Sequence, residues 1–291
     1  MSTTNDLDQS SHIWFKEFFT GNTSGHFMLV KRFLHTEKTQ YQRIDIFDTY
    51  RYGRVFALDG ITMTTEMDEF MYHEMLVHVP MFLHPNPKRV LIIGGGDGGS
   101  LREVLKHGTV EEAILCEIDF KVIEAARKYL KSAVEFDNPR AKIVNENGVE
   151  FVNHFKNAFD VIIVDSTDPT AGEGGHLFTE KFYRSCYDAL TENGVFSAET
   201  ESPVLDPGWV KLAYKRIKKT FPVTKLYLGF MSTYPSGCWS YTFASKGIDP
   251  VKDFDSKRVE KFQKDLRYYN SEVHIAAFAL PNFVKELIQG L

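Results

Sequence analysis

The sequence predicts an α/β protein: a mostly parallel sheet sandwiched by helices, preceded by a small antiparallel β unit. Between residues 26 and 65, short runs carry apolar residues at alternate positions, as in QRIDIFD (42–48), which indicates half-buried strands. From residue 88 onward, runs that are apolar on both faces alternate with amphipathic segments, the pattern of parallel strands covered by helices. The pattern changes near residue 65, so we expect two domains, 1–65 and 66–291.

In the N-terminal domain, strands are expected over FMLVKRFL (27–34), QRIDIFD (42–48) and RVFALDG (54–60), the last closed by Gly60. The segment DEFMYHEMLVHVPMFLHP (68–85) follows, and its apolar residues recur every three and four positions, which predicts a helix. Pro85 and Pro87 are expected to end this helix because proline cannot continue it.

The second domain is expected to alternate strands and helices. The expected strands are RVLIIGGG (89–96), AILCEID (113–119), AKIVNEN (141–147), FDVIIVDS (159–166), GVFSAET (194–200), TKLYLGF (224–230) and CWSYTFAS (238–245). Helices are expected over 98–106, 120–130, a short stretch near 149, 179–190 and 207–220. In such a sheet, ligands bind outside the carboxyl ends of the strands, where the strand order reverses. The residues that end each strand are therefore the candidates for a site.

Composition excludes several classes of function. The 34 Lys and Arg residues do not exceed the 39 Asp and Glu residues, and a net charge of −5 argues against nucleic acid as a partner. No apolar run approaches the roughly 18 residues needed to span a bilayer, and the polar start MSTTNDLDQSSHIWF does not read as a secretory signal. Three cysteines with no C-x-x-C spacing are interpreted as structural thiols, which agrees with an expected cytoplasmic location.

The first of the parallel strands ends in GGGDGG (94–99), which contains G-x-G-x-x-G and directly precedes a helix. Gly94, Gly96 and Gly99 would permit a tight turn and let a ligand approach the N–H groups that start the helix. The plain alternative is a tight strand-to-helix turn. Glu117 ends the second strand, 18 residues beyond Gly99, close to the usual offset of an acid that holds ribose hydroxyls. Together these features predict an adenosine-containing ligand.

Asp97 is the informative departure in the glycine loop. A carboxylate there would repel a pyrophosphate, so it argues for a cationic ligand such as the sulfonium of S-adenosylmethionine and its relatives. The alternative is that Asp97 caps the helix and faces away from the ligand.

Two further strand ends carry candidate residues. Asn147 and Gly148 follow the third strand, where an amide could bond adenine or simply cap the next helix. Asp165 and Asp168 stand three apart at the end of the fourth strand. Like charges in a cleft lower the stability of the fold, so this pair is better explained by a function than by a stabilising role. The segment TAGEGGHLFT (170–179) that follows is expected to be a mobile lid or a plain surface loop.

The motifs GGGDGG, CEID and DSTDP in that order, with DEFMYHEM upstream and TYPSGCWSYTFAS downstream, resemble the polyamine aminopropyltransferases, the spermidine synthase family. The resemblance covers nearly the whole chain. It implies a Rossmann-like, S-adenosylmethionine-type methyltransferase fold with a small N-terminal antiparallel β domain. It also implies transfer of an aminopropyl group from decarboxylated S-adenosylmethionine to an amine such as putrescine, giving spermidine and 5′-methylthioadenosine.

Carried over by position, the resemblance assigns a role to each candidate. Asp165 would accept the proton of the attacking amine, and the amine would be held by Asp168, Tyr234, Tyr72 and His73. The donor would be held by Gln42, Asp97, Glu117, Asn147 and Gly148. His73 stands where other members carry Gln.

Neither a metal nor a redox cofactor is expected, because the histidines show no metal-ligand spacing; decarboxylated S-adenosylmethionine would be a co-substrate. An aliphatic ammonium has a pKa near ~10, so it must lose a proton before it attacks. Crowding by Asp168 and Asp97 would raise the pKa of Asp165 and make it a better base.

Two departures from the family pattern and two rival functions remain open. Many relatives carry Pro where this chain has Gly172, and Gln where it has Glu199; Glu199 would favour a longer or more highly charged amine, or it would simply pair with a nearby cation. The first rival is an S-adenosylmethionine-dependent N-methyltransferase, including one for putrescine, and the second is an inactive nucleoside-binding or assembly protein on the same fold. Because a β unit this small cannot bury its own apolar faces, a homodimer or homotetramer is expected.

Overall fold

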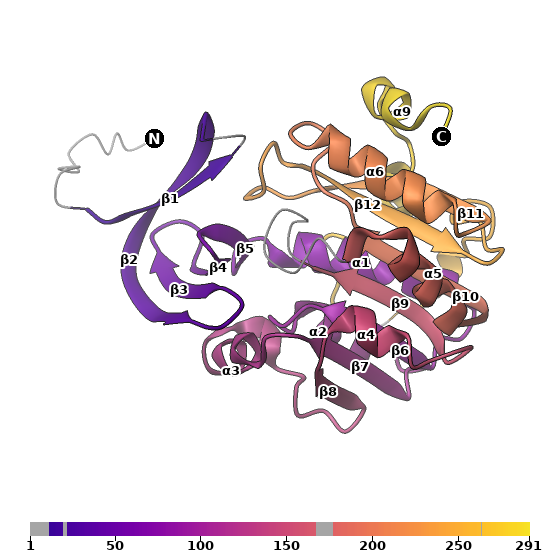
Figure 1. The fold of residues 1–291 in the computed structure, drawn as a ribbon, viewed down its shortest axis with the longest axis horizontal. Helices are drawn as coiled ribbons and strands as arrows, with labels where there is room; N and C mark the ends of the chain where they lie inside the picture. Colours follow the sequence, from indigo (N-terminus) through magenta and orange to yellow (C-terminus); the bar gives the residue numbers. More distant parts are fainter. Residues whose placement is uncertain (1–11, 20–21, 167–176, 263) are drawn as a thin grey trace. The chain divides into compact units, whose positions relative to one another are not determined.

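The computed structural model describes residues 12–19, 22–166, 177–262 and 264–291, which fall into two compact units, Met1–Met67 and Asp68–Leu291 (Figure 1). Among the helices of these residues, none is long and apolar enough to cross a membrane.

The N-terminal unit is an antiparallel sheet, which confirms the predicted architecture. Its described strands lie in the order β1-β2-β3-β4-β5 and span Trp14–Phe19, Ser24–Lys38, Arg43–Thr49, Arg54–Leu58 and Ile61–Thr65. Alternation places Met28, Val30, Phe47 and Val55 on one buried face. The sequence analysis missed β1, whose FKEFF segment mixes charged and aromatic residues that the pairing with β2 accommodates.

The second unit holds a seven-stranded sheet within its described residues, in the order β11-β12-β10-β9-β6-β7-β8 (Figure 1). The strands are β6 (Arg89–Gly94), β7 (Glu112–Glu117), β8 (Ala141–Asn145), β9 (Phe159–Asp165), β10 (Leu190–Glu199), β11 (Val223–Phe230) and β12 (Cys238–Ser245). Strands β6 to β10 are parallel, and β12 runs antiparallel to both β10 and β11. This is the predicted Rossmann-like arrangement.

Helices cover both faces of this sheet. Buried residues of α1 (Glu69–Leu83), α2 (Gly99–Leu105), α3 (Phe120–Tyr129), α7 (Ser256–Glu260) and α8 (Ser271–Ala277) pack on one face. Those of α4 (Gly148–Val152), α5 (Glu180–Ala189) and α6 (Pro207–Lys218) pack on the other (Figure 1). The helices beyond β12, among them α9 (Asn282–Ile288), were not predicted, because each is only five to seven residues long and carries little periodic signal.

Helix α1 is buried on nearly every side, rather than along a single stripe. It contacts α2 and four strands of the sheet, β9 to β12, and only Glu69 and Met71 among its residues keep partial exposure. Pro80 lies inside the helix, which ends at Leu83 before the expected stop at Pro85. Its N-terminal half carries Tyr72 and His73 to the carboxyl edge of the sheet.

The strand order reverses between β6 and β9. The chain runs outward from β6 to β7 and β8, then returns to the opposite side of β6 as β9, so a crevice opens at the carboxyl ends of these two strands. Gly94 and Asp165 are paired across this point. Gly94 has a φ of 80°, and a Cβ atom there would lie 2.1 Å from the carbonyl oxygen of Asp165, so only glycine permits this approach.

Candidate active site

Asp165 ends β9 and forms the centre of a buried polar cluster. Its side chain is oriented by two hydroxyl groups: Tyr72 donates to Oδ1 at 2.9 Å and Ser100 donates to Oδ2 at 2.6 Å. Burial raises the pKa of Asp165 and the charge of Asp97 raises it further, while the charge of His73 and the two hydroxyl donors oppose the shift. A carboxylate in this setting is a stronger base than an exposed one.

Asp97 lies in the glycine loop between β6 and α2 and combines both interpretations of the sequence. Its Oδ1 accepts a hydrogen bond from the N–H of Gly99, the first residue of α2, at 2.6 Å, so the carboxylate holds the start of the helix although Gly98 is the N-cap residue. It does not face away from the site, because the same oxygen lies 3.4 Å from Nε2 of His73. Asp97 is therefore held by the helix and still presents its charge toward Asp165.

His73 is completely buried, and its imidazole lies between carboxylates. Nδ1 lies 2.6 Å from Oε2 of Glu69, one turn back on α1, and Nε2 faces Asp97. Arg102 holds Glu69 with two hydrogen bonds of 2.8 and 2.9 Å. Burial favours the neutral ring, but the carboxylates of Asp97 and Glu69 raise the pKa of His73 well above its usual value. A Cβ atom on Gly99 would lie 2.2 to 2.4 Å from this ring, so glycine makes room for it.

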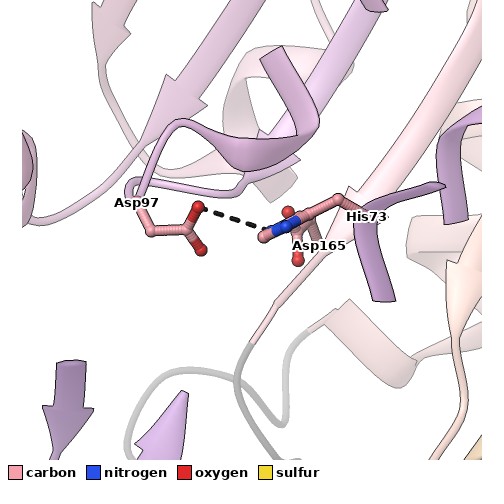
Figure 2. A group of neighbouring side chains, drawn as sticks. All are labelled: His73, Asp97 and Asp165. Carbon is pink, nitrogen blue, oxygen red and sulfur yellow. Dashed lines mark ion pairs between the residues drawn. The ribbon is translucent and has the colours of Figure 1, made fainter. Parts of the chain in front are cut away.

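Figure 2 shows His73, Asp97 and Asp165 turned toward one another from three different elements. Each offers one ligand atom, these atoms lie within 4.8 Å of one another, and all three residues are buried. The set has the composition of a metal-binding group. Sequence spacing could not reveal it, because the three residues are brought together only by the fold.

Aromatic side chains adjoin the carboxylates. The ring of Tyr72 lies 5.7 Å from the rings of both Tyr234 and Tyr241, and Tyr234 lies 4.6 Å from Trp239. Burial and the charge of Asp165 raise the pKa of Tyr72 and of Tyr234 well above 10, so both hydroxyls stay protonated. Trp239 Nε1 and the Tyr241 hydroxyl are buried, and neither has a hydrogen-bond partner among the described residues. The faces of these aromatic rings suit an alkyl ammonium group.

The sequence analysis missed Trp239 and Tyr241. Their spacing of two on a strand places both side chains on one face of β12, which is the signal that could have found them. Ser100 and Asp68 were also missed, since each acts through a contact with a residue far away in the sequence.

The other predicted donor residues lie at neighbouring strand ends. Glu117 ends β7, its Oε1 accepts from the N–H of Asp119 at 2.9 Å, and burial raises its pKa to about 7. Asn147 caps α4 by accepting a hydrogen bond from the N–H of Val149 at 2.9 Å, which is the plain alternative for this residue. Gly148 begins that helix and leaves no room for a Cβ atom beside Ile93, 2.4 Å away.

Glu199 ends β10 and is 3% exposed. Its carboxylate accepts a hydrogen bond from the N–H of Glu201 at 3.2 Å. Its charge also contributes to the raised pKa of Tyr72, Tyr234 and Tyr241. Glu199 therefore lies beside the aromatic group, the name given to these three tyrosines and Trp239.

For three predicted residues the structure gives no position relative to this cluster. Asp168 and Gly172 lie outside the described residues. Gln42 lies in the turn between β2 and β3 of the N-terminal unit, where its carbonyl accepts from the N–H of Thr39 and its own N–H donates to the Thr39 hydroxyl. The roles predicted for them remain predictions.

Comparisons with known proteins agree with this geometry. Residues 69–256 match the family model described as "Spermine/spermidine synthase domain", and residues 13–66 match "Spermidine synthase tetramerisation domain". Proteins named polyamine aminopropyltransferase from Thermotoga neapolitana and Thermotoga maritima are 70% and 69% identical over 282 residues, which cover 97% of this chain and 95% of each relative. A solved structure described as spermidine synthase in complex with the transition state analogue AdoDATO is 69% identical, has a TM-score of 0.95, and matches over 97% of this chain and 96% of that one.

Proposed function

The chain belongs to the spermidine synthase family of aminopropyltransferases, and from this premise we propose that it transfers an aminopropyl group from decarboxylated S-adenosylmethionine to putrescine or a related amine. The products are spermidine and 5′-methylthioadenosine. The relative with the same fold and 69% identity, solved with the analogue AdoDATO, supports this donor.

Asp165 is the proton acceptor in this proposal. The attacking amine arrives as an ammonium ion with a pKa near ~10 and must lose a proton to expose its lone pair. The neutral nitrogen then attacks the methylene carbon beside the sulfonium. A C–N bond forms while the C–S bond breaks, its electron pair goes to sulfur, and the proton on Asp165 later passes to solvent. No covalent enzyme intermediate is needed, so alignment of the two substrates supplies much of the acceleration.

The donor occupies the edge formed by the ends of β6, β7 and β8. Asp97 holds the ammonium of the aminopropyl group and Glu117 the ribose hydroxyls, while Asn147 and Gly148 lie on the adenine side. The loop of Gly94, Gly96 and Gly99 admits the nucleoside, and Gln42 keeps the donor-binding role that the resemblance predicts for it.

The acceptor amine lies against the aromatic group. Tyr72 and Tyr234 offer ring faces to its methylene chain and ammonium ends, and Asp168 and His73 complete its contacts. Trp239 and Tyr241, which the sequence analysis did not include, extend the same aromatic surface.

The pairing of Asp97 with Asp165 is the observation that carries this proposal. Two buried carboxylates, whose ligand atoms lie within 4.8 Å, form a site for cations rather than for phosphate or carboxylate groups. A methyltransferase would have to accommodate the carboxylate of S-adenosylmethionine near Asp97, so the N-methyltransferase alternative is not favoured.

The test is a comparison of the two donors. The enzyme is incubated with putrescine and either decarboxylated S-adenosylmethionine or S-adenosylmethionine, and the nucleoside product is identified by mass spectrometry. Amine-dependent release of 5′-methylthioadenosine from the decarboxylated donor is expected. Release of S-adenosylhomocysteine instead would establish the methyltransferase, and no turnover with either donor would leave only a binding or assembly role.

We further propose that residues 1–65 serve assembly into a homodimer or homotetramer and that 66–291 carry the catalytic site. The match of residues 13–66 to a tetramerisation domain supports this, as do large apolar side chains that stay exposed in the described part of the N-terminal sheet, among them Trp14, Phe18, Phe27 and Phe33. Sedimentation should show species larger than the 33.4 kDa chain. A cytoplasmic location remains a prediction from the sequence.

A further inference from the structure

The three side chains of His73, Asp97 and Asp165 have supporting contacts of the kind that orient metal ligands (Figure 2). Nδ1 of His73 lies 2.6 Å from Glu69, so Nδ1–H donates to that carboxylate and Nε2 faces Asp97. A carboxylate behind the far nitrogen of a ligand histidine is the usual way in which proteins fix its tautomer. Arg102 in turn fixes Glu69 with two hydrogen bonds.

Both aspartates are oriented as well. Asp165 accepts hydrogen bonds from the hydroxyls of Tyr72 and Ser100, and Asp97 accepts one from the N–H of Gly99. Each carboxylate therefore has a fixed direction before any ligand enters.

Nε2 of His73 is the independent sign of a ligand. The side chain is 0% exposed, and this nitrogen makes no hydrogen bond within the described residues, although it lies at ion-pair distance from Oδ1 of Asp97. Its 3.4 Å separation from Oδ1 of Asp97 is about the distance between two ligands of a tetrahedral ion that each lie ~2.0 to 2.1 Å from the metal. The ligand atom of Asp165 lies within 4.8 Å of the other two, so Asp165 reaches the same ion after a small shift or through a bound water.

We propose that His73, Asp97 and Asp165 bind a divalent transition-metal ion of the zinc or cobalt class when the substrates are absent. One imidazole nitrogen with two carboxylate oxygens suits these ions better than calcium or magnesium, which prefer oxygen ligands alone. The ion occupies the place of the cationic groups of donor and amine. It is therefore an inhibitor that competes with the substrates, a consequence that rests on the proposed function.

Binding requires the neutral imidazole, so the metal displaces a proton from Nε2. The groups that face this ring are Glu69 on α1, Asp97 in the glycine loop and Asp165 at the end of β9; they favour the proton and the metal alike. Binding is accordingly measured at a mildly alkaline pH, where proton competition is weaker.

The direct test is titration of the chelator-treated enzyme with Co²⁺ alone, followed by its visible absorption spectrum, and with Zn²⁺ by calorimetry. We expect one ion per chain. The absorption spectrum should be that of Co²⁺ with fewer than six ligands, at least one of them nitrogen. His73→Gln, an amide of similar length, should weaken binding by about 100-fold, and Glu69→Gln by about 10- to 100-fold. His154→Gln, the same change at an exposed histidine, is the control and should bind as the wild type does.

Because His73 is buried, its variant is checked by thermal unfolding, and X-ray absorption of the Zn²⁺-loaded wild type provides a second measurement that needs no variant. An imidazole and two or more oxygen ligands support the proposal. A six-oxygen shell, no bound ion, or equal weakening by His73→Gln and His154→Gln would overturn it.

The inhibition is tested separately. Zn²⁺ should raise the KM for the donor without lowering kcat at saturating donor, and excess donor should release the bound ion. Turnover in the presence of a chelator reports on the proposed function alone. If the ion binds but inhibition does not depend on donor concentration, the competitive role is overturned while aminopropyl transfer stands.

Discussion

The carboxylate of Asp68, the residue before α1, accepts hydrogen bonds from both the N–H and the hydroxyl of Thr233, at distances of 2.8 to 3.0 Å. Ser232 adds a third donor at 2.6 Å. Asp68 is 1% exposed, and its side chain does not cap the helix that it precedes. It therefore ties the start of the helix that carries Tyr72 to the loop that carries Tyr234.

Replacing Asp68 should loosen the amine site more than the donor site. In Asp68→Asn, one acceptor oxygen becomes an NH₂ group that faces the N–H and hydroxyl donors, so Tyr234 loses its fixed position. We expect the KM for putrescine to rise about 10-fold, or ~1.4 kcal/mol, with the KM for the donor nearly unchanged. Asp255→Asn, the same change at the exposed residue before α7, is the control for the substitution itself. Equal increases in both KM values would show a general structural defect instead.

Asp165→Asn tests the proton acceptor. The amide keeps the shape of the side chain but cannot take the proton, so kcat should fall on the order of 10²-fold or more while donor binding changes little. Single-turnover rates and calorimetric titration with the donor separate the two effects. Asp160→Asn is a matched control, because Asp160 lies at the opposite end of the same strand and accepts from the N–H groups of Lys88 and Arg89. Near-normal turnover in Asp165→Asn would remove Asp165 from the role.

Tyr72→Phe tests how its neighbours set the pKa of Asp165. The hydroxyl of Tyr72 stabilises the charged form of Asp165, which opposes the larger effect of burial on its pKa. Removing this donor should raise the pKa of Asp165 further, so the base is protonated over a wider range. The acidic limb of the kcat/KM profile should move to higher pH, with activity lost mainly on the acid side. In Tyr241→Phe, which removes a hydroxyl with no bond to Asp165, this limb should stay in place; a shift of the same size would contradict the assignment.

The sequence predicted the meeting of Asp97 and Asp165 because the carboxyl ends of adjacent parallel strands lie at one edge of a sheet. It also predicted the glycine loop, whose conformation is local. It did not predict the Asp68 contact, because an aspartate before a helix is expected to cap it, and here hydrogen bonds to a loop 165 residues away replace that role. Tertiary contacts of this kind have no signal in local spacing.

The metal-ligand composition around His73 was missed for a related reason. Spacing rules find ligands that share a helix or a turn, whereas these three come from α1, the loop after β6 and the end of β9. The helix that carries His73 also departs from the expected pattern. A spacing of three and four suggests one apolar face, yet α1 is enclosed by the sheet and α2, so His73, Glu74 and His78 are buried with hydrogen-bond partners.

Glu199→Gln tests the choice of acceptor. Glu199 is buried beside the aromatic group, and its charge acts on Tyr72, Tyr234 and Tyr241, so it lies where a second ammonium of the amine would be felt. A carboxylate there should favour an amine with a further positive charge, and neutralising it should lower kcat/KM for spermidine, which carries a third positive charge, more than for putrescine, by about 10-fold. The measurement is kcat/KM for putrescine, cadaverine, agmatine and spermidine with both enzymes. Glu192→Gln, at an exposed position near the other end of β10, is the control. If the ranking of the four amines is the same in Glu199→Gln and in the wild type, Glu199 does not select the amine and has a structural role, such as holding the N–H of Glu201.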